Sequence, residues 1–255
     1  MLTKLIVCIV AGLGAGIGTG FAGLSAAAVI SPMLITFLGF EPYEAVGIAL
    51  ASDVLASAVS ACTYGKNKNL DIKNGLVMLF TVLIFTLFGS YIASRVPQTT
   101  MGNLSVFMTF LLGIKFIVKP VMTTKEVQAS KTPREKFLQS LASGIVIGFI
   151  CGFIGAGGGM MMLLILTMVL GYELKTAVGT SVFIMTFTAF TGAASHFAIG
   201  GLPDPAAFVI CIAATFLGAQ VSAKVANRAD AKTLNRMTGI VLAVLGAVMI
   251  IVKLF

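Results

Sequence analysis

One carboxylate, that of Asp53, lies well inside an apolar stretch of the sequence. An ionisable side chain within a long apolar stretch is costly to bury and is usually functional. We therefore predict that Asp53 binds a proton or a coupling cation. The alternative is a structural role, in which the carboxylate caps a neighbouring helix.

Glycine-rich segments interrupt two long apolar runs, and each is followed by the start of a new helix. The unpaired N–H groups and partial positive charge at a helix start attract anions, and small residues there let a ligand approach the backbone. Ser25 is suited to cap such a helix or to contact the ligand. The alternative is that the small residues only permit tight helix packing. The candidate substrate-binding residues of the two segments are Gly23, Ser25, Ala26, Gly155, Gly157 and Gly158.

Hydroxyl side chains are frequent in the apolar run that follows each glycine-rich segment. Most of them are expected to bond back to their own helix. Thr180 and Ser181 are predicted exceptions, because they sit early in a helix that faces the glycine-rich segment. No arginine or lysine lies in the middle of an apolar run, so an anion would be held by helix ends, amide N–H groups and hydroxyls. Such a site suits a small tetrahedral or pyramidal oxyanion.

Cysteine and histidine provide no metal or catalytic constellation, so we predict neither a metal, a cofactor nor an enzyme. The four cysteines share no metal-ligand spacing. His196 is the only histidine, which excludes any mechanism that needs a histidine pair. It falls at the end of an apolar run, a turn or more beyond the candidate serines. A serine protease would need a base beside its nucleophile.

The composition is that of an all-α polytopic membrane protein. Of the 255 residues, 58% are hydrophobic and 10% are charged, and the mean hydropathy is +1.05. Soluble domains have about 25% charged residues. The net charge of +8 comes from basic residues in short loops between apolar runs, a topology signal rather than a nucleic-acid surface. The expected partners are a lipid bilayer and a small-molecule anion, with no nucleic acid. A homodimer is one of the oligomeric states that the sequence allows.

The chain contains an internal repeat. A shift of 132 positions aligns residues 12–50 with residues 144–182 without a gap, and twelve of the 39 pairs are identical. The matches include several glycines, Glu41 with Glu173, and an Ala-Val-Gly triplet. Asp53 aligns with Met185, so any role of that carboxylate belongs to one half only. Duplicated halves are common in secondary transporters.

Each half is predicted to be a glycine-broken hairpin of two short or half-length helices followed by three transmembrane helices. A single straight helix of 36 residues, the length of each broken run, would be about 54 Å long, whereas the hydrocarbon core is about 30 Å thick. The first repeat covers residues 1–120 (hairpin 4–39, spans 44–64, 75–95 and 102–120), a cytoplasmic linker covers 121–136, and the second repeat covers 137–255 (hairpin 137–171, spans 175–198, 204–224 and 236–254).

Basic residues give an orientation to this arrangement. The loops 65–74, 119–136, 171–175 and 224–236 all fall on one side and hold thirteen Lys and Arg residues, a cytoplasmic signature. The halves are then expected to be two inverted repeats in the cytoplasmic (inner) membrane, with both termini on its outer side. In such repeats the two hairpin tips can meet near the midplane.

The sequence resembles the sulfite exporter TauE/SafE family of membrane permeases over nearly its whole length. The resemblance rests on the glycine-rich stretch 20–23 running into Pro32-Met33-Leu34, and on Ala-Val-Gly-Thr-Ser at 177–181. Ala26 and Ala27 stand where the family often has glycine. The resemblance implies transport of a sulfur-containing anion, whereas the residues alone indicate a small anion.

The expected function is therefore that of a secondary transporter, which moves the anion by alternating access with Asp53 binding the coupling ion. The alternative is an anion-selective channel, because glycine-rich hairpins also build pores.

Overall fold

The structure, a computed structural model, describes residues 2–93, 114, 117–118, 132–154, 159, 162–163 and 165–254. Every regular element within these residues is a helix, which confirms the predicted all-α class. The helices long and apolar enough to cross a membrane are Leu2–Ala22, Glu44–Lys66, Leu174–Ala198 and Pro205–Arg228. Most of the predicted span at 102–120 lies outside the described residues.

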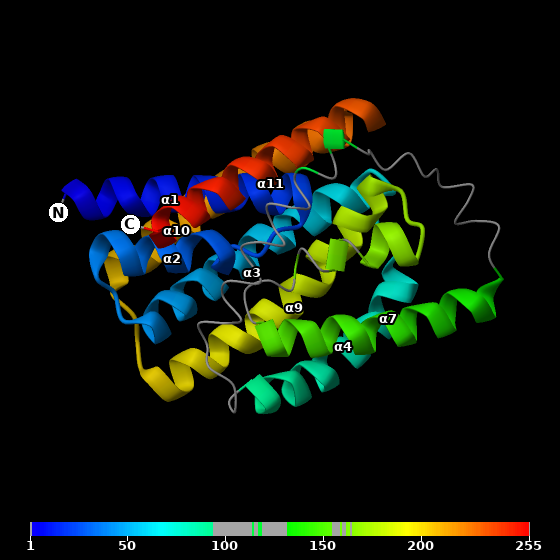
Figure 1. Cartoon of the computed structure of the whole chain (residues 1–255), viewed down its shortest axis with the longest axis horizontal. Helices are drawn as coiled ribbons and strands as arrows, with labels where there is room; N and C mark the ends of the chain where they lie inside the picture. The colour runs from blue at the N-terminus through cyan, green and yellow to red at the C-terminus, as the bar shows by residue number, and fades with distance from the viewer. Residues whose placement is uncertain are drawn as a thin grey trace.

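The described elements follow one another as α1 (Leu2–Ala22), α2 (Ala27–Leu38), α3 (Pro42–Lys66), α4 (Ile72–Ala93), α7 (Pro133–Ile154), the π-helix η1 (Ile165–Val169), α9 (Leu174–Gly200), α10 (Pro205–Arg228) and α11 (Ala231–Leu254) (Figure 1).

The outer surface is apolar and much of the interior is small or polar, as expected of helices that face lipid. On α10 the exposed side chains Val209, Leu217 and Val221 repeat at helical spacing on one face. Buried polar side chains include the Asp53 carboxylate, Thr19 and many other hydroxyl residues. This distribution reverses that of a soluble protein.

α1 and α2 form the predicted broken hairpin, but α1 is not half-length. Its 21 residues span about 31 Å, enough to cross the hydrocarbon core, and only the 12-residue α2 is short. The two helices lie side by side, and the start of α1 and the end of α2 are at the same end of the molecule (Figure 1). α1 stays helical despite its glycines, three of which, Gly12, Gly16 and Gly20, are packed against α10.

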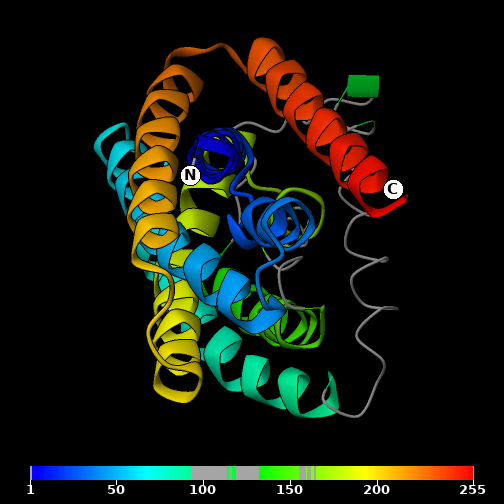
Figure 2. The same cartoon turned by 90° about the vertical axis from the view of Figure 1, so that its left-hand side faces the viewer.

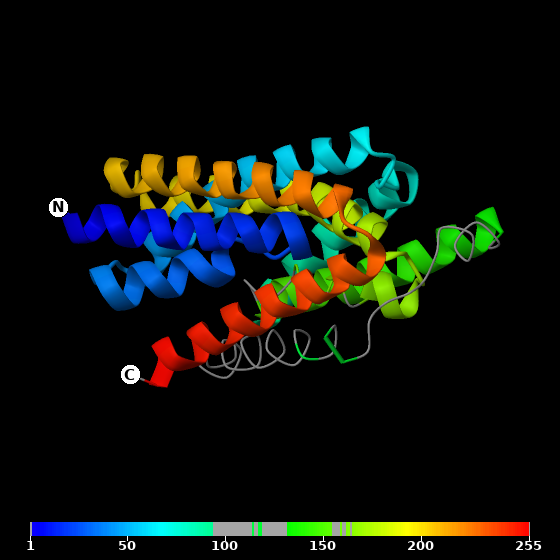
Figure 3. The ribbon, with the colours of Figure 1, turned by 90° about the horizontal axis from the view of Figure 1, so that it is seen from above.

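Helices of the two halves are packed against each other in matching pairs. α1 contacts α10 and α7 contacts α4 (Figure 3). A Cβ added at Gly16 of α1 would lie 2.7 Å from the backbone N of Ala219, and one added at Gly148 of α7 would lie 2.6 Å from the carbonyl oxygen of Val82. Gly16 and Gly148 are aligned in the repeat, so both copies use the same glycine for close helix packing. Seen nearly end-on, α1 lies among α2, α10 and α11 (Figure 2).

The helix that leaves each break ends in the same way. Gly39 and Gly171 both have a positive φ, 67° and 70°. The residue after each glycine donates its backbone N–H back into the helix: Phe40 to the Leu34 carbonyl over 3.3 Å, and Tyr172 to the Leu166 carbonyl over 2.9 Å. Only glycine adopts this conformation without a steric cost, which explains the conserved spacing between the copies.

Hydrogen bonds between the halves tie together each end of the bundle. At one end, Asn69 donates to the side chain of Asn227 in the other half over 2.7 Å. Lys175, which belongs to the same half as Asn227, donates to the Asn227 carbonyl over 3.0 Å. At the other end, Lys4 forms an ion pair with Asp204, 2.6 Å between Nζ and Oδ2. Both termini lie at this second end (Figure 1).

Candidate functional site

The break between α1 and α2 is fixed by its own hydrogen bonds. Gly23 has a φ of 62° and donates its N–H to the carbonyl of Thr19 over 2.9 Å. The Thr19 hydroxyl donates to the Leu24 carbonyl over 2.7 Å. A side chain thus provides the hydrogen bond for a backbone carbonyl that lies outside both helices. Irregular backbone at membrane depth is tolerated where protein surrounds it, and Leu24 and Ala26 are fully buried.

The carboxylate of Asp53 accepts two hydrogen bonds beside this break. Asp53 lies near the middle of α3 and is 1% exposed. Ser25 donates to its Oδ2 over 2.7 Å, and Ser57 donates to its Oδ1 over 3.0 Å. The backbone N–H of Ala26 also interacts with the carboxylate. The structure therefore brings two predicted site residues, Ser25 and Asp53, into direct contact.

Gly23 and Ser181 also meet at the break. A Cβ at Gly23 would collide with the Ser181 hydroxyl, so glycine is required here by both its φ and its neighbour. The Ser181 hydroxyl donates to the Val178 carbonyl of its own helix over 2.9 Å. Ser181, which belongs to α9, therefore lies beside the break between α1 and α2, and its hydroxyl is already hydrogen-bonded within α9.

The second glycine-rich segment reaches the same place through Gly159. A Cβ added at Gly159 would lie 2.6 Å from the Gly23 carbonyl oxygen and 2.9 Å from the Ser25 backbone N and from the Met185 sulfur. The predicted site residues Gly155, Gly157 and Gly158 lie outside the described residues. At Gly159 the two segments are in contact in the interior.

Thr180 lies away from this cluster, against the turn between α3 and α4. Its Oγ1 accepts the backbone N–H of Asp71 over 3.2 Å. Asp71 caps α4 by accepting the Asn74 N–H over 3.1 Å, and it accepts the Tyr172 hydroxyl over 3.0 Å. Burial raises the pKa of Tyr172, and the neighbouring Asp71 raises it further, so this hydroxyl stays protonated as a donor. Thr180 thus joins α9 to an end of the bundle rather than to Ser25 and Asp53.

Sequence reasoning missed Ser57 as a member of the site. Most hydroxyls of α3 and α9 bond back to their own helix, as expected; Ser52, Thr63, Thr186 and Thr191 are examples. Ser57 instead binds Asp53, four residues earlier. The i, i+4 spacing to the only deep carboxylate was the signal that could have identified it.

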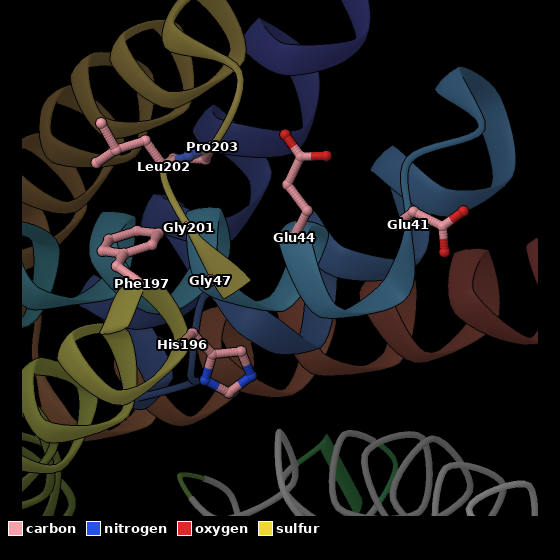
Figure 4. A pocket seen from close by; sticks show the side chains of 8 residues that line it. All are labelled: Glu41, Glu44, Gly47, His196, Phe197, Gly201, Leu202 and Pro203. Atoms are coloured by element: carbon pink, nitrogen blue, oxygen red, sulfur yellow. The ribbon is translucent and has the colours of Figure 1, made fainter. Parts of the chain in front are cut away.

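A separate cavity of about 270 Å³ lies at the end of the bundle that holds the termini. It is lined by Glu41, Glu44, Gly47, His196, Phe197, Gly201, Leu202 and Pro203 (Figure 4). Glu44 points toward Pro203, and its Oε1 accepts the backbone N–H of Asp204 over 2.7 Å, whereas Glu41 and His196 point in other directions. The carboxylates therefore do not converge on one ligand position.

Ligands for a metal ion do not cluster in the part of the chain that the structure describes. No group of three or more His, Cys, Asp and Glu side chains is close enough to hold an ion there. The described cysteines Cys8, Cys62 and Cys211 are free thiols. What the interior does provide is a carboxylate, two donating hydroxyls and a helix start, a set suited to exchanging a proton and binding an anion.

Comparison with known proteins identifies the family of this chain. The probable membrane transporter protein YunE of Bacillus subtilis (strain 168) is 25% identical over 99% of both chains. The probable membrane transporter protein YdhB of the same strain is 24% identical over 83% of this chain and 86% of its own. A probable membrane transporter protein of Methanocaldococcus jannaschii is 25% identical over 98% and 97%. The sequence profile of the sulfite exporter TauE/SafE family matches residues 8–249. The protein is thus a multi-pass membrane transporter, and it belongs to the sulfite exporter TauE/SafE family.

Proposed function

We propose that this chain is a secondary transporter that moves a small anion, a sulfur oxyanion or an organosulfonate, across the cytoplasmic membrane by alternating access. The observation that carries the proposal is the contact of the two glycine-rich segments, Gly159 against Gly23 and Ser25, beside a buried helix start. A helix start with small residues around it binds anions through backbone N–H groups and its dipole. The sulfur chemistry of the substrate rests on the family.

Alternating access follows from an arrangement of two inverted repeats, which several contacts support. In Figure 1 the aligned helices α1 and α7, α3 and α9, and α4 and α10 run in opposite directions. The contact of α1 with α10 of the other half corresponds to the contact of α7 with α4 of the other half. Two halves that exchange such contacts can rock against each other around a central site.

The orientation proposed for the membrane places the basic end of the bundle in the cytoplasm. Lys66, Lys175 and Arg228 lie at this end, where α3 and α10 finish and α9 begins. Cytoplasmic loops collect Lys and Arg. Both termini and the cavity around Glu44 would then lie outside.

Asp53 is the proposed coupling site, because it is the carboxylate in direct contact with the break. A proton on Asp53 would remove a buried negative charge beside the position of the anion. Since its repeat counterpart is Met185, one coupling group would serve each chain.

The test is flux into proteoliposomes of the purified protein. Radiolabelled sulfite, thiosulfate, methanesulfonate, sulfate and acetate are supplied in turn, with and without a pH gradient. We expect saturable uptake of at least one sulfur anion, stimulated when the side that supplies the anion is acidic. Ohmic single-channel currents would support an anion channel instead. Absence of flux for every sulfur anion would contradict the proposed substrate class.

A further inference from the structure

The N-terminus of α2, where the substrate anion is expected, already holds an anionic group of the protein. α2 begins at Ala27, and its N-cap Ala26 provides no side-chain hydrogen bond. The Asp53 carboxylate from α3 takes that place, through Ser25 and the backbone N–H of Ala26. Carboxylates and oxyanions bind helix starts through the same donors. Asp53 and the substrate therefore require the same groups.

No second charge compensates Asp53 in the described part of the chain. α2 has no ionisable side chain, and α1, α9, α10 and α11 carry their charged residues toward their ends. The ionisable groups deeper in α1 and α10 are the thiols of Cys8 and Cys211, which lie against each other. On α3 itself, the hydroxyl of Tyr64 donates to the Gly20 carbonyl over 2.8 Å. Because two negative charges at one buried site repel strongly, the site accepts one anion at a time.

The two helices that form this contact also have hydrogen-bonding capacity that the protein does not fill. Ser31 on α2 and Ser60 on α3 are buried hydroxyls without a hydrogen-bond partner. Ser60 follows Asp53 by seven residues, or two turns, and so shares the helix face of Asp53 and Ser57. A buried hydroxyl without a hydrogen-bond partner destabilises the fold and calls for a functional explanation.

We propose that the Asp53 carboxylate is a tethered competitor for the substrate anion at the N-terminus of α2, and that the anion binds when Asp53 carries a proton. This inference rests on the proposed anion transport and specifies how the proton is coupled to it. A proton from the aqueous side adds to the carboxylate, and the neutral acid gives up its place at the helix start. The anion then binds the Ser25 hydroxyl and the backbone N–H of Ala26 in its place. The proton and the anion cross together and leave together.

The single deep carboxylate of each chain, Asp53, sets the number of protons transported with each anion. The position equivalent to Asp53 in the second half is Met185, whose sulfur faces Gly159 and cannot take up a proton. One proton therefore accompanies each anion, and transport of a monovalent anion is electroneutral. Linkage is reciprocal, so anion binding must also raise the affinity of Asp53 for its proton.

The experiment measures binding of methanesulfonate, whose charge does not change across the pH range used, to the full-length protein in detergent. Only the protonated fraction of the wild type is competent, so its apparent affinity should fall about tenfold per pH unit above the titration range of Asp53. Asp53→Asn should bind with an affinity independent of pH, close to that of the acidic wild type. Glu44→Gln, which changes a carboxylate at the far end of α3, should keep the wild-type pH slope.

A second measurement does not depend on the folding of any variant. Wild-type protein in weak buffer should take up about one proton for each methanesulfonate bound at alkaline pH, seen as a rise in pH. A pH-independent affinity of the wild type, a wild-type slope in Asp53→Asn, or binding without proton uptake would overturn the tethered-competitor mechanism. Those outcomes leave anion transport standing if flux is saturable. Absence of both binding and flux for methanesulfonate and every other sulfur anion would instead contradict the proposed function.

Discussion

At the scale of single residues, the site depends on contacts between positions far apart in the chain. Ser25 and Asp53 are separated by 28 residues and are 2.7 Å apart, and Gly23 meets Ser181 from the other half. A residue with a Cβ at position 23 would be strained by the positive φ of 62°, and its Cβ would collide with the Ser181 hydroxyl. Gly39 offers a matched comparison, because its φ is 67° and nothing lies within 4 Å of an added Cβ.

Substitution of these two glycines separates backbone strain from collision. Gly39→Ala should lower the free energy of unfolding by about 1 kcal/mol, through its backbone alone. Gly23→Ala should lower it by about 2–3 kcal/mol more, because the new methyl group also displaces Ser181. Thermal unfolding in detergent measures both. The double variant Gly23→Ala/Ser181→Ala should recover part of the difference, and a double variant as unstable as Gly23→Ala would show that Ser181 is not the obstacle.

At the scale of elements, the first residues of α10 show how a helix N-cap also links two helices. Asp204 is the N-cap of α10 and accepts the Ala207 N–H over 2.8 Å, while its other oxygen pairs with Lys4 of α1. These contacts lower the pKa of Asp204, the Ala207 N–H most strongly and Lys4 next. One carboxylate therefore both starts α10 and joins the two halves at the end that holds the termini.

Removal of this carboxylate should destabilise the protein in a pH-dependent manner. Asp204→Ala is expected to lower the free energy of unfolding by about 1–2 kcal/mol at neutral pH, because the cap is lost. Lys4→Gln keeps the cap and should cost less, about 0–1 kcal/mol, because the ion pair is partly exposed. A lowered pKa means that the contribution is complete above the unfolded value, about 3.9, and is lost as the pH falls through the folded value. Melting curves should therefore converge for wild type and Asp204→Ala in acid, and a constant difference at all pH values would contradict this assignment.

At the scale of the whole molecule, the two ends of the bundle differ in charge, and the proposed orientation places them in different compartments. Lys68 lies in the turn between α3 and α4 at the basic end, and Leu202 lies between α9 and α10 at the other end, where its side chain is 95% exposed. The hydrogen bonds of Asn227 and the ion pair of Lys4 assign these loops to opposite ends.

Labelling of single cysteines tests the orientation of the molecule in cells. In a background with all four native cysteines replaced, Leu202→Cys should react with a membrane-impermeant maleimide in intact cells. Lys68→Cys should react only after permeabilisation, because the positive-inside rule places its loop in the cytoplasm. The reverse pattern would invert the proposed topology, and labelling of both from outside would contradict the assignment of the two loops to opposite sides.

The sequence by itself determined the membrane class, the family, the internal repeat and a break in the first long apolar run, expected within the glycine-rich residues 14–23. These depend on composition, on matched residues and on local glycine chemistry, all of which are written along the chain. Only the tertiary structure decided that α1 is a full-length helix, because its packing against α10 outweighs the low helix propensity of glycine. It alone placed Thr180 at the α3–α4 turn and Asp53 at the start of α2. Which donor reaches a buried carboxylate depends on how separate helices pack, and no local sequence pattern specifies that.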